Sequence, residues 1–360
     1  MALQDGNVGT LTGSSYGDLS RGDAFKIQKK MLPIAKRLLT FGKFAQKEVK
    51  SQGEGLEIRH RRYERLPIAD QAIAEGVTPD FDNLEQVTIR HTLEQFGSYV
   101  NVTDVMMAAA TDPMVQIITE RQAQQAGETV DFLSYKVARA GSQVGYCRSA
   151  VSAGRGDVDL TISGMDNTSN GTATTKFLDQ AIRVLERNDA QKLKSQLDAS
   201  DGVTTSPIRE SYVAICHTDL RQDLETVPGY VPVEKYADQS DVLDGEMGSA
   251  RGIRFIGTTQ AVPFKDAGST DHVGGSSDLQ LSTSGTKADV YPVIIMAQDA
   301  FGCATLGGKD SLTSKVVSPK PSPGDPLGQR GHISWSTWYS CTVLQNLWMY
   351  RLECAVTKFA

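Results

Sequence analysis

Few residues in this chain stand at spacings that could do catalytic chemistry. Gly13–Gly17 reads Gly-Ser-Ser-Tyr-Gly and fits G-x-S-x-G, the pattern around the serine nucleophile of many hydrolases. Such a serine needs a strand before it and a helix after it, because the sharp turn between them exposes the hydroxyl. The surrounding Gly-, Ser- and Thr-rich segment predicts neither element. We therefore interpret the match as chance.

Metal and nucleotide sites are not indicated either. The histidines are His60, His91, His217, His272 and His332, and none of them forms an H-x-x-x-H pair. The cysteines contain no C-x-x-C pair, and the chain has no G-x-x-x-x-G-K-[ST] loop. We expect no catalytic residue, no metal and no cofactor. An enzyme with an unrecognised site around Asp299, His217 and Cys303 is one alternative hypothesis.

A repeated tripeptide favours a second alternative. Arg-Gly-Asp, the adhesion motif, occurs at 21–23 and again at 155–157. A virion component or adhesive protein that binds a host surface through such loops would have few copies per particle. In a chain with 33 glycines the tripeptides carry little weight, because loop composition explains them.

The composition is that of a globular protein with reduced thiols. The 360 residues are 39% hydrophobic and 22% charged, enough for one large core or two medium ones. No signal-peptide pattern is visible, and the longest apolar run, Tyr291–Ala297, is too short to span a bilayer. Five scattered cysteines, an odd number, argue against a disulfide framework. We expect folding in a cytoplasm and no membrane partner.

A basic segment interrupts an otherwise acidic chain. Nine basic and two acidic residues between 21 and 50 give +7, and the chain's net −6 leaves −13 for the rest. Such an arm can meet acidic protein or nucleic acid, or it can be the solvated face of a helix. The basic residues that we single out there are Lys26, Lys29, Lys30, Lys36 and Arg37.

The most informative elements are two charged strands on either side of a wide acidic loop. Residues 56–66 and 86–96 predict strands, the second running on to Val102, and His60 and His91 could face each other across them. A two-stranded hairpin is only marginally stable in water, and this one has too few apolar residues to cover a face. We therefore expect another copy of the chain to support it. The charged side chains expected at that contact are Arg59, Arg61, Arg62, Glu64, Arg65, Arg90 and Glu94.

The rest of the chain mixes helices and strands. Asp112 and Pro113 form a strong helix start, and the apolar spacing that follows predicts a long helix over 113–139. A second helix is expected over 174–197. Over 332–343 apolar and polar residues alternate, which predicts a long half-buried strand. The mixture of strands and helices from 174 to 310 predicts one α/β-type lobe.

The order of these parts resembles that of a known family. The residues that carry the resemblance are Tyr99–Asp104, Tyr212–His217, Gly245–Phe255, Ala297–Gly302 and Asp325–Gly331. Their order and spacing are similar to those of tailed-phage major capsid proteins with the Hong Kong 97-type fold, in the group typified by the N4-type podophages. The likeness covers most of the chain from residue 21 to residue 360.

That resemblance implies an α+β capsid fold with four parts. Residues 1–53 would form an N-terminal arm, and residues 54–102 an extended hairpin, the E-loop, that lies over a neighbouring subunit. A peripheral domain would comprise 103–171 and 311–360, with 113–139 as its spine helix beside the C-terminal strands. Residues 172–310 would form an axial α/β domain around the five-fold and six-fold centres.

The resemblance also implies assembly rather than catalysis. The chain would form pentamers and hexamers that close an icosahedral shell around double-stranded DNA in the virion, after assembly in the host cytoplasm. Its partners would be other copies of itself and scaffold and portal proteins, with a decoration protein as a further candidate. Some shells of this fold are cross-linked through an E-loop lysine, but no lysine occurs from Ser51 to Tyr135. We therefore expect a shell without those covalent links.

Overall fold

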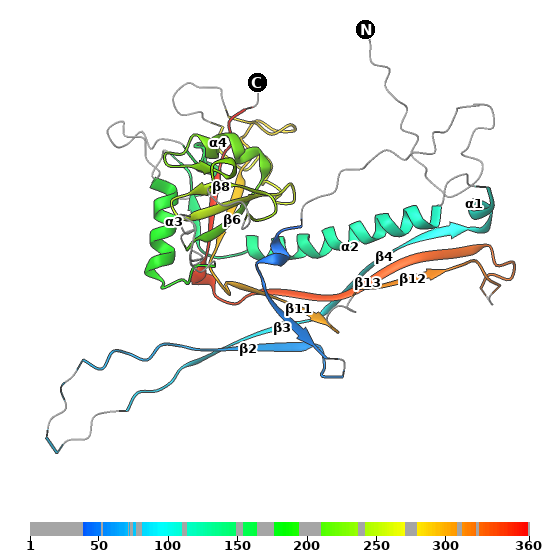
Figure 1. Ribbon diagram of the computed structural model, residues 1–360, viewed down its shortest axis with the longest axis horizontal. Coiled ribbons are helices and arrows are strands. Elements are labelled where there is room, and N and C mark those ends of the chain that lie inside the picture. Colours follow the sequence, from blue (N-terminus) through cyan, green and yellow to red (C-terminus); the bar gives the residue numbers. More distant parts are fainter. Residues whose placement is uncertain are drawn as a thin grey trace, which may run out of the picture.

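Two β-sheets and a separate hairpin organise the part of the chain that the structure describes. The computed structural model describes residues 39–51, 53–70, 72, 75–76, 81–109, 114–148, 154–163, 176–193, 210–236, 242–270, 279–307, 312–321 and 324–358. A lobe built on one sheet lies at one end, and helix α2 and the second sheet extend away from it side by side (Figure 1). Helix α2 lies on one side of the second sheet, and the hairpin of β2 and β3 projects on the opposite side (Figure 1).

The extended part is a five-stranded sheet around one long strand. Its strands are β1 (Gln46–Lys50), β4 (Glu94–Thr103), β11 (Phe301–Leu306), β12 (Thr313–Val317) and β13 (Arg330–Val343). β13 pairs antiparallel with β4, β11 and β12. Buried and more exposed residues alternate along β13 from Gly331 to Tyr339, which confirms the predicted half-buried strand.

Helix α2 (Met114–Arg139) follows the short helix α1 (Asp104–Ala109) and packs against β13. The predicted helix over 113–139 is therefore confirmed. Gln122 donates from Nε2 to the carbonyl of Ile333 at 2.6 Å, and the hydroxyls of Ser134 and Tyr339 lie 2.7 Å apart. Because these groups are buried, each bond replaces a hydrogen bond to water that folding removes.

The described N-terminal residues are bound to this helix. Asp131 of α2 is 3% exposed, and its carboxylate accepts from the backbone N–H groups of Thr40 and Gly42, each at 3.2 Å. These bonds hold the 3₁₀ turn η2 (Phe41–Lys43), whose Phe41 ring packs on Tyr135. The chain then continues into β1, which pairs parallel with β11. This part of the predicted arm is fixed to the body of the subunit.

The lobe contains a seven-stranded sheet in the order β5-β14-β10-β6-β9-β8-β7. Its strands are β5 (Val144–Tyr146), β6 (Tyr212–Cys216), β7 (Val231–Pro232), β8 (Glu246–Ala250), β9 (Ile253–Gly257), β10 (Tyr291–Met296) and β14 (Met349–Cys354). The helices are α3 (Lys176–Arg187) and α4 (Arg221–Glu225), with the 3₁₀ turns η3 (Arg155–Asp157), η4 (Thr218–Leu220), η5 (Val233–Lys235) and η7 (Asn346–Trp348). Every residue of β6, β9 and β10 is buried, so these strands form the core of the lobe.

Helix α3 is shorter than the predicted 174–197, because it ends at Arg187. Asp189 has a φ of 52°, and Ala190 donates its N–H to the carbonyl of Leu185 at 3.1 Å. This is a left-handed C-terminal cap, a conformation that Asp and Asn adopt more readily than most residues. Apolar residues at helical spacing continue past the cap to Leu193, which is why the prediction ran too far.

The division of the chain between the two sheets also differs from the prediction. β5 and β14 lie within the residues expected to be peripheral, yet both belong to the sheet of the lobe. β11 lies within the residues expected to be axial, yet it belongs to the extended sheet. Alternation and apolar content reveal a strand but not its neighbours. The sequence could therefore not assign these three strands to their sheets.

A buried ionic contact joins the lobe to the end of α2. Glu353 of β14 is fully buried, and its carboxylate lies 2.6 Å from Arg155 Nε and 2.8 Å from Arg351 Nε. Arg351 also donates to the carbonyl of Arg139, the last residue of α2. A cation is favourable there, because the last carbonyls of a helix carry partial negative charge.

Candidate subunit interface

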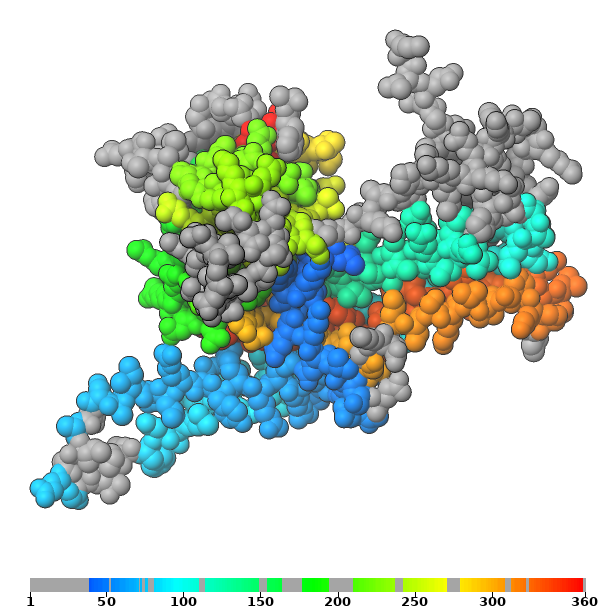
Figure 2. Space-filling view, in the orientation of Figure 1, coloured from blue at the N-terminus to red at the C-terminus, as the bar shows by residue number. Residues whose placement is uncertain are grey.

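The hairpin expected to contact another subunit is present, but its second strand is shorter than predicted. β2 (Glu57–Tyr63) pairs antiparallel with β3 (Gln86–Thr92). The predicted continuation to Val102 is a separate strand, β4, which joins the extended sheet after Leu93. The hairpin and the arms beyond it form a narrow projection from the body of the subunit (Figure 2).

An apolar anchor explains where the hairpin begins. Ile58 and Leu93 are 5% and 2% exposed, and they pack with Ala304 of β11. The N–H of Leu93 donates to the carbonyl of Leu56 at 2.9 Å. Burying two large apolar side chains contributes about 3–6 kcal/mol. The root of the hairpin is thus supported by its own subunit, which the sequence analysis did not predict.

Two histidines face each other on the inner side of the hairpin, as their positions suggested. The Nε2 atoms of His60 and His91 are 3.0 Å apart, and the rings are stacked. His91 Nδ1 lies 2.8 Å from the hydroxyl of Ser340 in β13, and Glu48 of β1 lies 3.3 Å from His60 Nε2. Burial lowers the pKa of His91, and the nearby His60 lowers it further. The neutral ring is therefore the form that fits this contact.

Arg62, Glu64 and Arg65, three of the predicted contact residues, form ion pairs within their own chain. Arg62 pairs with Glu64 at 2.7 Å and also donates to the carbonyl of Leu344 at 3.1 Å. Arg65 lies 3.2 Å from Asp189, at the end of α3, and both side chains are largely exposed. Exposed pairs of this kind contribute little to stability. They nevertheless place Arg65, in the arm that follows β2, beside Asp189 of the lobe.

The outer face of the hairpin carries an excess of positive charge. Arg59 and Arg90 are direct cross-strand partners, and Arg61 follows on the same face. Glu57 lies 3.0 Å from Arg59 Nε and 3.9 Å from Arg90 Nε, and the hydrogen bond from Arg59 lowers its pKa. Like charges directly opposite each other on a sheet are unfavourable. The carboxylate of Glu57 is therefore shared by two facing arginines on an exposed surface.

The remaining predicted residues lie elsewhere. Glu94 begins β4, where it pairs with Tyr339, so it belongs to the extended sheet and not to the hairpin. The basic residues of the proposed arm lie outside the described residues, and these are Lys26, Lys29, Lys30, Lys36 and Arg37.

Exposed apolar side chains near the tip of the hairpin were missed by the sequence analysis. Ile68 is 87% exposed and Phe81 is 85% exposed, and they flank the loop on either arm. Leu66 and Leu84 are about half exposed. Apolar surface that gathers on one exposed part of a protein marks interaction sites, so these four side chains are candidates for a contact with another surface. The sequence did contain a signal for them, because large apolar residues are unexpected in an acidic loop that shows neither helical nor strand periodicity.

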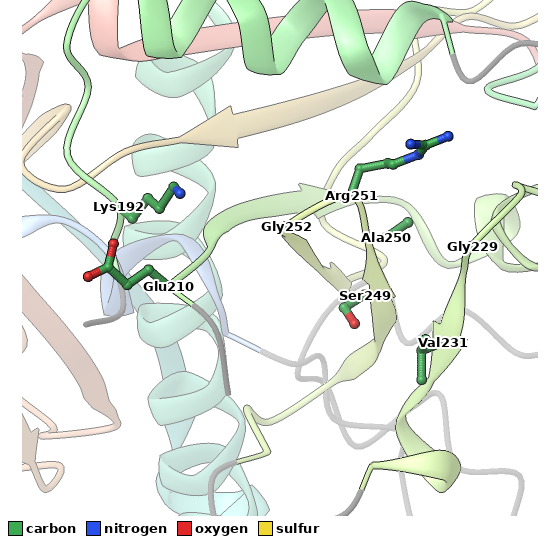
Figure 3. A pocket seen from close by; sticks show the side chains of 8 residues that line it. All are labelled: Lys192, Glu210, Gly229, Val231, Ser249, Ala250, Arg251 and Gly252. Carbon is green, nitrogen blue, oxygen red and sulfur yellow. The ribbon is translucent and has the colours of Figure 1, made fainter. Parts of the chain in front are cut away.

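The structure does not bring together the three residues of the enzyme hypothesis, Asp299, His217 and Cys303. Met296 pairs with Val213, so Asp299 follows at one end of β6 while His217 follows at the other end. Cys303 lies in the other sheet. A hollow of about 720 Å³ on the lobe has Lys192 and Glu210 on one side and Arg251 on the other (Figure 3). Among the described residues no cluster of His, Cys, Asp and Glu could hold a metal ion, and no helix could cross a membrane.

The hypothesis of an adhesive protein is weakened for one of its two Arg-Gly-Asp motifs. In the second Arg-Gly-Asp tripeptide, Arg155 is paired with the buried Glu353, and its guanidinium lies 3.6 Å from the centre of the Phe264 ring. Its guanidinium is thus committed within the chain. The first tripeptide, at 21–23, lies outside the described residues.

Comparisons with known proteins identify the family. The family model described as phage capsid protein matches residues 86–328, more than half of the chain. The major capsid protein of Pseudomonas phage KPP21 is 22% identical over 287 residues, which cover 74% of this chain and 67% of that protein.

Two solved structures show the fold. The capsid of Ralstonia phage GP4 has a TM-score of 0.60 at 12% identity, covering 97% of this chain and 99% of that chain. The capsid structure of Cyanophage P-SCSP1u has a TM-score of 0.58 at 12% identity, covering 96% of each chain. The chain therefore belongs to the phage capsid protein family, and it is a structural protein of a phage capsid with the Hong Kong 97-type fold, not an enzyme.

Proposed function

We propose that this chain is the major capsid protein of a tailed phage, and that its copies form pentamers and hexamers that close an icosahedral shell around double-stranded DNA. The observation that carries this proposal is the hairpin of β2 and β3. Its root is bound to its own subunit, while Ile68 and Phe81 near its tip are almost fully exposed. Such side chains are stabilised when a second surface covers them.

The parts of the subunit receive distinct roles in this proposal. The E-loop, residues 54–102 with its free portion before β4, lies across a neighbouring copy. The extended sheet and α2 form the peripheral domain, and the seven-stranded lobe is the axial domain around the five-fold and six-fold centres. The motifs of the sequence favour the N4-type podophage group. The N-terminal arm, residues 1–53, contacts a scaffold protein or an adjacent spine helix through its basic residues.

The charge on the outer face of the hairpin favours an ionic contact with an acidic surface of another copy. The outer face of the hairpin has Arg59, Arg61 and Arg90 against the single carboxylate of Glu57. An adjacent acidic surface of another copy would balance that excess, and the chain as a whole carries −6. An acidic protein also suits the inside of a DNA-filled head, because a strongly basic lining would bind phosphates tightly. Portal and decoration proteins are the further partners expected in such a head.

Negative-stain electron microscopy of the purified, expressed chain tests the proposal. We expect shells, tubes or ring-shaped capsomers of five and six subunits. Weak single contacts add up when each subunit binds several neighbours, so assembly should be strongly concentration-dependent. A population that stays monomeric or trimeric at every concentration, with or without a co-expressed scaffold protein, contradicts the proposal.

A further inference from the structure

A pair of sulfur atoms lies inside the extended sheet, outside the surfaces described above. Cys303 of β11 and Cys341 of β13 are direct cross-strand partners, and their Sγ atoms are 3.0 Å apart. Both residues are free thiols in this structure. Cys303 is 6% exposed, whereas Cys341 is only partly buried. Cys341 is thus the more exposed residue of the pair, and a small solute would approach from its side.

The strand register places the pair where a disulfide can form. Leu344 donates its N–H to the carbonyl of Ala300 at 3.0 Å, so those two opposite residues form a hydrogen-bonded pair. Hydrogen-bonded and non-hydrogen-bonded pairs alternate along two antiparallel strands. Cys303 and Cys341 stand three positions further along, so they form a non-hydrogen-bonded pair. Opposite Cα atoms at a non-hydrogen-bonded pair are about 4.5 Å apart. That separation lies within the range of about 4.4–6.8 Å that disulfides span.

The surroundings give the two thiols different roles. Its hydrogen bond with Cys341 lowers the pKa of Cys303, and Tyr339, Ser134 and Lys47 lower it further against the effect of burial. The pKa of Cys341 is raised, first by its hydrogen bond with Cys303 and then by burial. The thiolate is the reactive form of cysteine. Cys303 is thus suited to react first, with Cys341 still protonated beside it.

We propose that Cys303 and Cys341 form an intrachain disulfide when a peroxide oxidises the capsid after it leaves the reducing cytoplasm. The Cys303 thiolate attacks one peroxide oxygen, which gives a sulfenic acid and, after protonation of the departing hydroxide, one water molecule. The sulfur of Cys341 then attacks the Cys303 sulfur, and the hydroxyl leaves as a second water with the thiol proton. Two thiols and one hydrogen peroxide thus give one disulfide and two waters.

The bond would act within the subunit and not between subunits. It joins β11 to β13, and these strands carry β1 on one side and β4 on the other. β11 also holds Ala304 in the apolar anchor of the hairpin. The disulfide therefore fixes the sheet on which the E-loop stands, while the shell itself remains free of covalent links between chains.

Peptide mapping tests this inference directly. The particles, or the purified chain, are treated with hydrogen peroxide, unfolded with an alkylating reagent present and digested with trypsin without reduction. Cys303 is the single cysteine of peptide 288–309, and Cys341 is the single cysteine of peptide 331–351. We expect these two peptides linked, two hydrogen atoms lighter than their sum. Both peptides recovered as alkylated thiols, or joined to other cysteines, would overturn the proposal.

Two variants separate this role from ordinary packing. In Cys341→Ser no second thiol can resolve the sulfenic acid, so peroxide should carry Cys303 on to sulfinic and sulfonic acid. In the matched control Cys216→Ser the linked peptide should form as in the unchanged chain, since Cys216 lies in the lobe. Equal Cys303 over-oxidation in the unchanged chain and in Cys341→Ser contradicts the inference. The inference rests on the proposed function for its setting, but linked peptides in a chain that fails to form shells would refute only the assembly proposal.

Discussion

At the scale of single residues, buried polar contacts decide which segments the subunit holds and which it leaves free. Asp131 binds the N-terminal segment to α2, and the histidine pair stands between the hairpin and β13. Both contacts join residues far apart in the sequence. Sequence patterns suggested that His60 and His91 could face each other, but they did not single out Asp131.

Replacing Asp131 by Ala should destabilise the subunit by about 1–3 kcal/mol, because the buried N–H group of Thr40 and the partly buried one of Gly42 lose their acceptor. The free energy of unfolding in denaturant measures this. Gln116→Ala, at an exposed position on the same helix, is the matched control and should change stability by less than about 0.5 kcal/mol. Equal effects of the two substitutions would show that the carboxylate does not hold the segment.

The histidine pair should make subunit stability depend on pH. Burial lowers the pKa of His91 in the folded chain, whereas the unfolded chain binds a proton near the ordinary value of about 6.5. The stabilising effect of the neutral ring is therefore present above about pH 6.5 and is lost as the pH falls below it. Facing groups on β1 act in both directions, since the charge of Glu48 raises the pKa of His91 and that of Lys50 lowers it.

Thermal unfolding at a series of pH values tests this prediction. The melting temperature of the unchanged chain should fall more between about pH 7.5 and about pH 5.5 than that of His91→Asn. His332→Asn, which replaces an exposed histidine of β13, is the control and should follow the unchanged chain. A pH dependence in His91→Asn as steep as in the unchanged chain would contradict the assignment.

At the scale of elements, local sequence patterns predicted which helices and strands exist, but not which strands lie next to each other in the sheets. The long helix, the alternating strand β13 and the hairpin were all visible, because periodicity and capping residues are local signals. The break at Leu93, the end of α3 at Arg187 and the sheet membership of β5, β11 and β14 were not. Each depends on a tertiary contact or a left-handed backbone position that spacing alone does not encode.

The tip of the hairpin should be required for assembly but not for folding. Deleting residues 67–85 should leave a folded subunit, because the anchor of Ile58 and Leu93 lies outside the deletion. That variant should fail to form closed shells in electron micrographs. The milder double substitution Ile68→Asn and Phe81→Ser should have the same effect, whereas Leu281→Ser, an exposed leucine of the lobe, should not. Normal shells from either hairpin variant would refute the role of the tip.

At the scale of the whole molecule, a subunit whose hairpin projects from its body suits a shell of interlocked neighbours. No lysine occurs from Ser51 to Tyr135, so the hairpin lacks the nucleophile of a covalent E-loop link. Mature particles boiled in detergent with a reducing agent should therefore release a monomer of 39.0 kDa on a denaturing gel. A ladder of covalent multimers under those conditions would contradict the prediction.

We propose above all that the hairpin of one subunit lies on another copy and thereby holds the shell together. A cryo-electron microscopy reconstruction of the assembled particle measures this most directly. We expect density for Ile68 and Phe81 against the surface of a neighbouring subunit, with carboxylates of that neighbour near Arg59, Arg61 and Arg90. A closed shell in which the tip of each hairpin touches only its own subunit would refute this role of the hairpin.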